Sequence, residues 1–404
     1  MTITDSRTPG PVLHSAGEVL TAARRIADDL RPGASGTDRA GSVPPAVLDA
    51  VRAAGLLTIN VPAAHGGADA SNRTVIEVLR TLASGDPSVA LLVFVHYTII
   101  YALTEQGSPE LQEKIFADVL RGARIGNAAA ERGTPRAGLL TTRITVGDDG
   151  AWRLTGRKYY STGAKGADWV AVATLSPDEK SVLALVPGDA PGLELLDDWD
   201  SAGMRATESG TLVLDGVDVD PDYVVEFWRN FAAPALWPAR DGLLHNAVDV
   251  GAARTALADA AAYVRDTARV SAPAGAAGIE RAVDDPHLIH RFGELTARLH
   301  AIELLLARGA DAIDAAAAAR PLTADDVALA FTAADAAKAL GGEIAAQIAN
   351  EVIALGGTAA ADDKLNLHRH WRNIRTHTVH DPARWRYHRL GSYVLNGPGI
   401  PETA

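Results

Sequence analysis

Two histidines three residues apart stand near the C-terminal end of the chain, in the segment RTHTVHDP at residues 375–382. Asp is a favoured helix N-cap and Pro a favoured first helical residue, so Asp381-Pro382 predicts that a helix begins directly after His380. A helix N-terminus is the positive end of the helix dipole and disfavours imidazolium, so His380 is expected to be neutral. Three interpretations follow: a metal pair of His377 with His380, a buried structural histidine, or a catalytic group.

The metal interpretation is the weakest, because the predicted helix begins after the pair and no third ligand follows at a spacing typical of metal sites. The sequence also holds no GxGxxG between a strand and a helix, no Walker loop, no HExxH and no GxSxG. It contains no cysteine, which excludes disulfides, a thiolate nucleophile and cysteine-ligated zinc. A nicotinamide-binding Rossmann domain, a P-loop NTPase, a zincin and an α/β-hydrolase are therefore not expected.

The composition is that of an ordinary soluble protein, with 47% hydrophobic and 22% charged residues among 404. The net charge of −12 opposes binding to nucleic acids. The segment 369–390 is an exception, with six arginines and four histidines against one aspartate, and is either a solvated helix pair or an anion- or cofactor-binding surface. The N-terminus has no apolar signal core, and no run approaches the roughly 18 apolar residues of a membrane span. We therefore expect a cytoplasmic protein without membrane or nucleic-acid partners.

The elements that must position these residues fall into three zones, and a chain of this length predicts two or three packed domains. After a loose leader at residues 1–14, apolar positions repeat with the helical period through residues 15–125. Residues 126–238 carry short alternating stretches too closely spaced for βαβ crossovers, which predicts an antiparallel barrel or sandwich. Residues 239–404 are Ala-rich and helical again, which predicts a C-terminal helical bundle with a terminal tail. The fold class is mainly α with a central antiparallel β domain.

Several individual elements can be placed within these zones. RITVGDDGAWRLTGRKYYSTG predicts a hairpin that turns at Asp148-Asp149-Gly150. Long helices are expected at residues 243–269, 286–315 and 324–355. Gly341-Gly342, inside the last of these helices, indicates close helix packing or a kink.

Four ordered segments carry a resemblance to the acyl-CoA dehydrogenase family of flavoproteins. They are VPAAHGG, GRKYYSTGAKGADW, WDSAGMRATESGTLVLDGVDV and IALGGTAAADDKLNLHRHWRNIRT. Together with the α–β–α layout they extend the similarity over roughly residues 15–395. The resemblance implies an N-terminal helical domain, a central β barrel or sandwich and a C-terminal four-helix bundle, with a flavin as cofactor.

The sequence departs from the dehydrogenases of this family at His380. Those enzymes carry a catalytic Glu at this place, because removing an α-proton from an acyl thioester requires a carboxylate base. This chain has no Glu from Arg369 to Leu395. HDP together with RHWRNIRTHT resembles instead the flavin-dependent monooxygenase branch of the fold, some of whose members oxidise sulfur. Members of that branch accept reduced FMN, sometimes FAD, from a separate NAD(P)H:flavin reductase and use O2.

The resemblance also implies roles at the reaction centre. Thr162 lies beside flavin N5, where a hydroxyl holds the N5 proton; the alternative is a Thr in a strand-end turn. His380 takes the place of a histidine found in the sulfur-oxidising members, unless it is a helix-entry histidine bonded to backbone. His96 and Tyr97 match a position near the end of an early helix and place the substrate, unless His96 is a buried histidine with satisfied hydrogen bonds.

Flavin binding is implied for Tyr160, Ser161 and Thr162 in the KYYSTG segment. Arg269 matches an arginine that binds the flavin phosphate, since a guanidinium forms a bidentate fork with phosphate; a surface salt bridge is the alternative. Trp199 either walls the isoalloxazine or belongs to the core. Asn127 opens the β domain where family members touch the flavin. Some relatives place an arginine just after the GG turn, where this chain has Thr358-Ala359-Ala360.

The function expected from the resemblance is that of a monooxygenase oxidoreductase, a homotetramer that acts through a C4a-hydroperoxyflavin on a small sulfur-, nitrogen- or ring-bearing substrate. A dry pocket suits this chemistry because water promotes loss of peroxide. The first rival is an acyl-CoA dehydrogenase with a displaced base, Glu131 or Glu351. The second is a nucleic-acid-binding member of the fold, whose basic surface only residues 369–390 supply. The sequence does not distinguish among the substrates.

Overall fold

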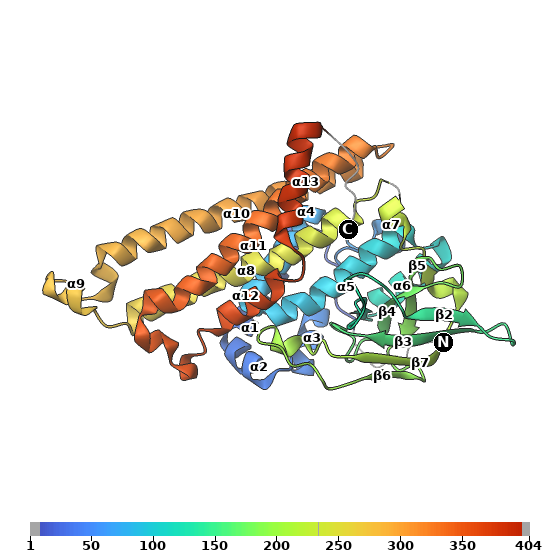
Figure 1. Cartoon of the computed structure of the whole chain (residues 1–404), viewed down its shortest axis with the longest axis horizontal. Helices are drawn as coiled ribbons and strands as arrows, with labels where there is room; N and C mark the ends of the chain where they lie inside the picture. The colour runs from blue at the N-terminus through green and yellow to red at the C-terminus, as the bar shows by residue number, and fades with distance from the viewer. Residues whose placement is uncertain (1–8, 233, 398–404) are drawn as a thin grey trace.

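The computed structural model describes residues 9–232 and 234–397. A β domain occupies one end of the molecule, and three long helices run side by side from it to the opposite end, where α9 lies (Figure 1). The N-terminal helices pack between the two parts. The order is helices, then strands, then helices, so the predicted fold class is confirmed.

The N-terminal zone is helical, and polar side chains cap most of its helices. Ser15 forms a capping box with Glu18, and Ser71, Asp86 and Ser108 each accept hydrogen bonds from backbone N–H groups in the first turn that follows. The helices are α1 (Ala16–Leu30), α2 (Ala34–Ala40), α3 (Pro45–Ala53), α4 (Asn72–Gly85), α5 (Pro87–Gln106) and α6 (Pro109–Leu120).

Helix α5 corrects one expectation from the sequence. By length and composition it is apolar enough to cross a membrane, which the sequence analysis did not anticipate for any segment. In the folded chain 89% of its apolar window is buried inside the molecule. Helix α5 is therefore a core helix that is hydrophobic on all sides because other elements surround it.

The β domain is one sheet of eight strands in the described chain, with the order β6-β7-β3-β2-β4-β5-β8 and β1 beside β4. Most neighbours are antiparallel, but β1 runs parallel to β4. The predicted hairpin is confirmed, since β2 pairs with β3 across the expected turn. The strands are β1 (Ile125–Ala128), β2 (Arg143–Val146), β3 (Trp152–Lys158), β4 (Trp169–Leu175), β5 (Ser181–Pro187), β6 (Leu193–Leu195), β7 (Leu212–Val219) and β8 (Val224–Val225).

The C-terminal bundle contains three long helices and two shorter ones that complete it, α12 and α13. Gly341 lies where α11 crosses α8, and a Cβ there would meet Asn246 Oδ1 at 2.3 Å, so this glycine allows close packing. The helices are α7 (Arg229–Ala232), α8 (Trp237–Asp266), α9 (Ala272–Ala276), α10 (Pro286–Ala318), α11 (Ala324–Gly356), α12 (Arg369–Thr378) and α13 (Ala383–Asn396).

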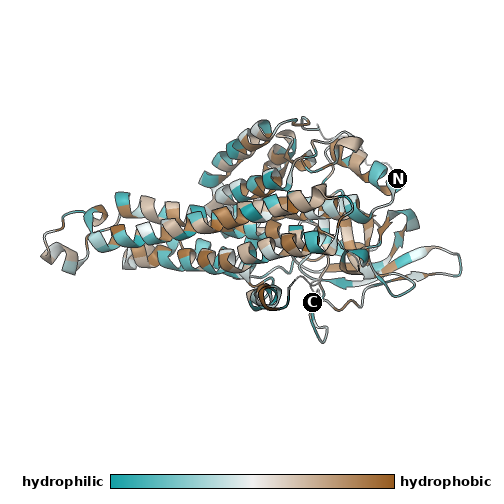
Figure 2. Cartoon of the chain, turned by 90° about the horizontal axis from the view of Figure 1, so that it is seen from above, coloured by the Kyte–Doolittle hydropathy of each residue, from teal (hydrophilic) through white to brown (hydrophobic). Residues whose placement is uncertain are grey.

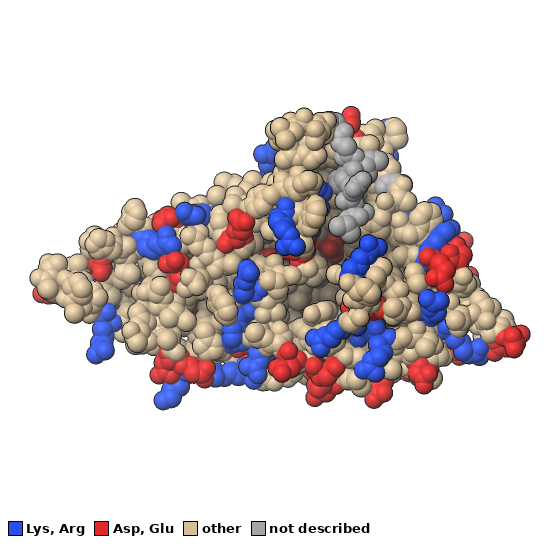
Figure 3. Space-filling model, in the orientation of Figure 1, with Lys and Arg blue, Asp and Glu red and all other residues tan. Residues whose placement is uncertain are grey.

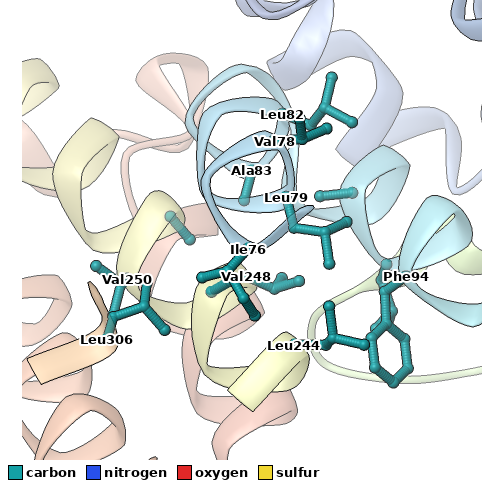
Figure 4. Packing of buried hydrophobic residues seen from close by; sticks show 14 of the residues in the cluster. Ile76, Val78, Leu79, Leu82, Ala83, Phe94, Leu244, Val248, Val250 and Leu306 are labelled. Carbon is teal, nitrogen blue, oxygen red and sulfur yellow. The ribbon is translucent and has the colours of Figure 1, made fainter. Parts of the chain in front are cut away.

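The largest core cluster joins the N-terminal helices to the bundle. Ile76 and Leu79 of α4 and Phe94 of α5 pack with Leu244 and Val248 of α8 (Figure 4). Along the long helices hydrophobic and hydrophilic residues share the same helix, as expected when one side is buried and the other faces solvent (Figure 2). This packing fixes α5 and α8 against each other, and both helices carry residues of the candidate site.

Candidate active site

The candidate site lies where the β domain meets α5, α8 and α12. Figure 3 shows a hollow near the middle of this face, close to the place where α5 and α12 lie in Figure 1, with Lys and Arg side chains on its rim. Two groups of polar side chains lie at this border. We call Thr162, Thr207 and Ser209 the hydroxyl cluster, and His245, His377 and His380 the histidine cluster.

The hydroxyl cluster belongs to two loops of the β domain. Thr162 Oγ1 lies 2.7 Å from Ser209 Oγ, which lies 2.7 Å from Thr207 Oγ1. Thr207 Oγ1 in turn donates a hydrogen bond to the Met204 carbonyl at 2.8 Å. All three side chains are buried, and Thr162, at 9% exposure, is the most accessible of them. Helix α12 holds this loop in place, because the Met204 N–H donates to Asn373 Oδ1 at 2.7 Å.

Tyr160 presents an aromatic face beside Thr162. Its backbone has φ +61°, a left-handed conformation that is unusual for a bulky residue and costs conformational energy. Its ring is half exposed, and it meets Tyr159 and Trp199 edge to face, with ring centroids 4.7 and 5.9 Å away. Trp199 is fixed by a hydrogen bond from Nε1 to the Met204 carbonyl at 3.1 Å. The strained turn therefore holds an open aromatic surface.

The histidine cluster is tied to a buried ion pair. His245 Nδ1 lies 2.9 Å from His377 Nε2, and His377 Nδ1 lies 2.7 Å from Asp249 Oδ1. Lys338 Nζ donates to Asp249 Oδ2 at 3.1 Å. Burial favours the neutral acid, but Lys338 and His377 outweigh it and hold the pKa of Asp249 below its usual value.

The ionised carboxylate fixes one proton of the histidine cluster. Asp249 accepts a hydrogen bond from His377, so His377 carries a proton on Nδ1. A second hydrogen bond joins His377 Nε2 and His245 Nδ1. Burial lowers the pKa of His245 well below its usual value, so this ring stays neutral. Its Nε2 lies 4.0 Å from Asp241 Oδ2.

His380 stacks on this pair from the segment between α12 and α13. Its ring centroid lies 4.0 Å from that of His245, whose other neighbour is Phe94 at 4.1 Å. His380 remains accessible, but the protein around it and the positive Lys338 lower its pKa to about 4. It is therefore neutral at pH 7, as its place before a helix predicts.

The capping prediction at this helix is wrong in detail. Pro382, not Asp381, is the N-cap of α13, and no side chain caps it. The Asp381 carboxylate instead accepts a hydrogen bond from Arg386 Nε at 2.9 Å. A charge-assisted bond to guanidinium replaces the cap here, because α13 brings Arg386 within reach.

His245 was not found from the sequence. Its partner His377 is 132 residues away along the chain, so no local spacing connects them. One signal was present: Asp241, His245 and Asp249 repeat every four residues and therefore share one face of α8, which is otherwise rich in Ala. Asp241 accepts a hydrogen bond from Thr98 Oγ1 at 2.9 Å, and burial raises its pKa to about 6.

The polar side-chain atoms of His96 and Tyr97 form hydrogen bonds with backbone groups. His96 is fully buried; Nε2 lies 2.7 Å from the Leu57 carbonyl, and Nδ1 accepts from the Ile125 N–H at 3.1 Å. Tyr97 donates its hydroxyl proton to the Leu56 carbonyl at 2.5 Å. Burial lowers the pKa of His96 to about 4. Both ring nitrogens are thus used by backbone, which favours the interpretation of a satisfied core histidine over the expected substrate contact.

The structure brings most of the expected flavin-binding residues together. The Asn127 N–H donates to the Thr162 carbonyl at 3.0 Å, which places β1 beside the hydroxyl cluster. Ser161 is fully buried, and its hydroxyl has no hydrogen-bond partner within residues 9–232 and 234–397. Arg269 is exposed and follows α8 next to α9, at the end of the bundle opposite the β domain (Figure 1). Within one chain it is therefore separated from Thr162.

The proposed displaced bases are bound elsewhere. Glu131 forms an ion pair with Lys158 at 2.7 Å and accepts from the Thr142 N–H; although burial opposes ionisation, these bonds lower its pKa to about 2. Glu351 pairs with Arg291 at 2.8 Å. Neither carboxylate is a free base next to the histidine cluster.

Four of the six arginines in the basic segment 369–390 form ion pairs with aspartates, most of them on other elements, which neither the solvated helix pair nor the anion-binding surface anticipated. The described partners of its arginines are Asp259 for Arg369, Asp38 for Arg372, Asp335 for Arg389, and Asp335 with Asp381 for Arg386. These ion pairs attach α12 and α13 to α2, α8 and α11. The segment is chiefly a structural clamp around the site.

The comparisons with known proteins agree with this fold. Models of the acyl-CoA dehydrogenase N-terminal, middle and C-terminal domains match residues 17–123, 128–217 and 243–385. The chain therefore belongs to the acyl-CoA dehydrogenase family.

Within the family several of its similar relatives are monooxygenases by name. Dibenzothiophene monooxygenase of Mycolicibacterium goodii is 31% identical over 98% of each chain. The probable FMNH2-dependent monooxygenase SfnC of Pseudomonas putida is 30% identical over 96% of this chain and 97% of its own. FMN-bound TdsC from Paenibacillus sp. A11-2 superimposes with a TM-score of 0.88 at 29% identity, over 95% of this chain and all of that one.

Proposed function

We propose that this chain is the oxygenase of a two-component system. It binds reduced FMN supplied by a separate flavin reductase and uses O2 to add one oxygen atom to a small substrate. The observation that carries the proposal is the histidine cluster: a neutral His380, backed by His245 and His377, stands at the helix entry where the dehydrogenases of the family need a carboxylate. The names of the relatives support FMN and a sulfur-bearing substrate.

The residues around Thr162 fit a flavin. The open aromatic face of Tyr160 and the wall formed by Trp199 suit a flat aromatic ring, and Thr162 Oγ1 offers one polar atom beside flavin N5. Asn127 and the buried Ser161 shape the same corner. When bound in its reduced form, the flavin supplies the electrons that activate O2.

The histidine cluster holds protons in fixed places. Asp249 keeps a proton on His377 Nδ1, and the hydrogen bond between His377 and His245 fixes the orientation of the ring against which His380 packs. A neutral His380 offers one donor and one acceptor to the reacting oxygen or the substrate. His245 and His377 are buried, so the hydrogen bonds that fix them are stronger than in solvent.

Arg269 enters this proposal only through an assembly. It lies far from Thr162 within one chain, so it reaches a flavin phosphate only in a neighbouring copy. We therefore propose a homo-oligomer, a tetramer by resemblance to the family, in which Arg269 of one subunit approaches the flavin of another.

The test supplies reduced FMN with an added flavin reductase and NADH under ¹⁸O2, with dibenzothiophene and a small alkyl sulfinate as probes. We expect a product that contains one ¹⁸O atom from O2. The rival activity is tested in parallel by adding butyryl-CoA to the FAD-loaded protein without oxygen. Bleaching of the flavin by butyryl-CoA, with no labelled product from any probe, would overturn the proposal.

A further inference from the structure

The three hydroxyls of the hydroxyl cluster form a chain of hydrogen bonds, and the distances determine which hydroxyl donates to which. Thr207 Oγ1 lies 2.8 Å from the Met204 carbonyl, which can only accept, so Thr207 donates there. Each hydroxyl has one proton. Ser209 must therefore donate to Thr207, and Thr162 must donate to Ser209, each across 2.7 Å. In this arrangement the proton of Thr162 is used inside the protein.

The opposite direction is weaker. It leaves Thr162 with the Tyr160 carbonyl as its acceptor inside the protein, at 3.4 Å, beyond the usual range for a hydroxyl donor. It also removes the short bond from Thr207 to the Met204 carbonyl. Three bonds of 2.7 to 2.8 Å are thus replaced by two such bonds and one long contact. Thr207 and Ser209 are each only 2% exposed, so water does not replace the lost bond of Thr207.

We propose that Ser209 and Thr207 are positioning residues that keep Thr162 Oγ1 as a hydrogen-bond acceptor toward the site. This inference rests on the proposed function, which places flavin N5 beside Thr162. Reduced flavin carries a hydrogen on N5, whereas oxidised flavin has only a lone pair there. When the Thr162 hydroxyl acts as an acceptor, it binds the N5–H of reduced flavin. Its lone pair repels the N5 lone pair of oxidised flavin. The cluster therefore makes the site select reduced over oxidised flavin before any chemistry takes place.

The test measures two dissociation constants, for reduced FMN under anaerobic conditions and for oxidised FMN in air, and takes their ratio. Wild type should bind reduced FMN more tightly. Ser209→Ala and Thr207→Val free the Thr162 hydroxyl to rotate, so the ratio should fall roughly three- to tenfold, about the value of one hydrogen bond. The change should come mainly from tighter binding of oxidised FMN.

Two variants serve as controls. Thr207→Ser, unlike Thr207→Val, keeps a hydroxyl at this position and should keep the wild-type ratio. Thr211→Val removes a buried hydroxyl of the same loop that donates to Asp198 rather than to the cluster, so it should leave the ratio unchanged. A ratio that stays at the wild-type value in Ser209→Ala, with reduced FMN still bound, would overturn the inference and leave the proposed function standing. Failure of the wild-type protein to bind either form of FMN would overturn both.

Discussion

At the scale of single residues, the site depends on a neutral imidazole held in one orientation. His380 lies on His245, whose ring is held in place by hydrogen bonds through His377 to Asp249. Its pKa is lowered to about 4 by the surrounding protein and by Lys338, so it keeps both a donor and an acceptor at pH 7. In the function proposed above, such a side chain assists oxygen transfer without removing a carbon-bound proton.

Replacing His380 by Ala should leave FMN binding intact and uncouple the reaction. We expect the yield of oxygenated product per reduced flavin consumed to fall roughly a hundredfold, the range of one positioned proton donor, with hydrogen peroxide released instead. The measurement is product by mass spectrometry against peroxide by a coupled assay. His290→Ala, an exposed histidine on α10, serves as the matched control. An unchanged product yield in His380→Ala would exclude the role given to this residue.

Asp249→Asn should destabilise the protein because it leaves Lys338 buried without its counter-charge. Breaking one side of a buried pair costs about 3–5 kcal/mol in the free energy of unfolding, measured here by urea denaturation. The double variant with Lys338→Met removes the orphaned charge and should regain much of that loss. If the single and double variants were equally stable, the pair would not be the cause.

At the scale of elements, the sequence predicted the helices and the hairpin because their signals are local. The period of apolar residues located α10 and α11 within a few residues, and the turn after β2 was evident from Asp-Asp-Gly. Contacts between segments far apart in the sequence could not be predicted from local patterns. The backbone partners of His96 lie in two other segments, and Arg386 replaces a cap that local rules favoured. The hydroxyl cluster and His245 were missed for the same reason.

His96 joins α5 to two neighbouring segments through its ring nitrogens. Because its pKa differs between the folded and unfolded states, it should make the free energy of unfolding depend on pH. Its folded pKa is lowered to about 4, so its contribution is complete above the unfolded value of 6.5 and is lost as the pH falls toward 4. Between pH 7 and pH 5 this amounts to about 2 kcal/mol. Asp86 and Asp241 act in the opposite direction, because burial raises the pKa of each to about 6.

The test is therefore a difference between two proteins. His96→Asn keeps a donor and an acceptor but does not titrate, so its unfolding free energy should fall less between pH 7 and pH 5 than that of wild type, by about 1–2 kcal/mol. Equal slopes for the two proteins would show that His96 does not titrate on unfolding in this range.

Adjacent glycines in α11 give a matched pair of substitutions. Gly341→Ala places a methyl group against the side chain of Asn246 at the crossing with α8 and should destabilise by about 1–3 kcal/mol. Gly342→Ala has its nearest neighbour, Thr378 Cγ2, at 3.6 Å and should gain up to about 1 kcal/mol from helix propensity. Thermal unfolding of both variants tests whether the close approach of α8 requires glycine at position 341. Equal changes in Tm for the two variants would show that it does not.

At the scale of the whole molecule, Arg269 and Thr162 lie far apart, and we propose that they bind one flavin only across two subunits. If Arg269 holds the flavin phosphate of a neighbouring subunit, Arg269→Ala should weaken binding of reduced FMN about tenfold and leave binding of reduced riboflavin, which lacks the phosphate, unchanged. Arg265→Ala, an exposed arginine near the end of α8, is the control. Equal losses for FMN and riboflavin would contradict a phosphate contact.

The clamp at Arg386 has a practical consequence. His380 lies three residues before α13, and Arg386 of α13 binds both Asp381 and Asp335 of α11. If His380 acts as we propose, a force applied to α13, for example by a C-terminal affinity tag on a surface, reaches the site through Asp381 and Pro382. Immobilisation through the N-terminus does not load this connection. We therefore expect protein immobilised through its C-terminus to consume more reductant per molecule of product than protein immobilised through its N-terminus.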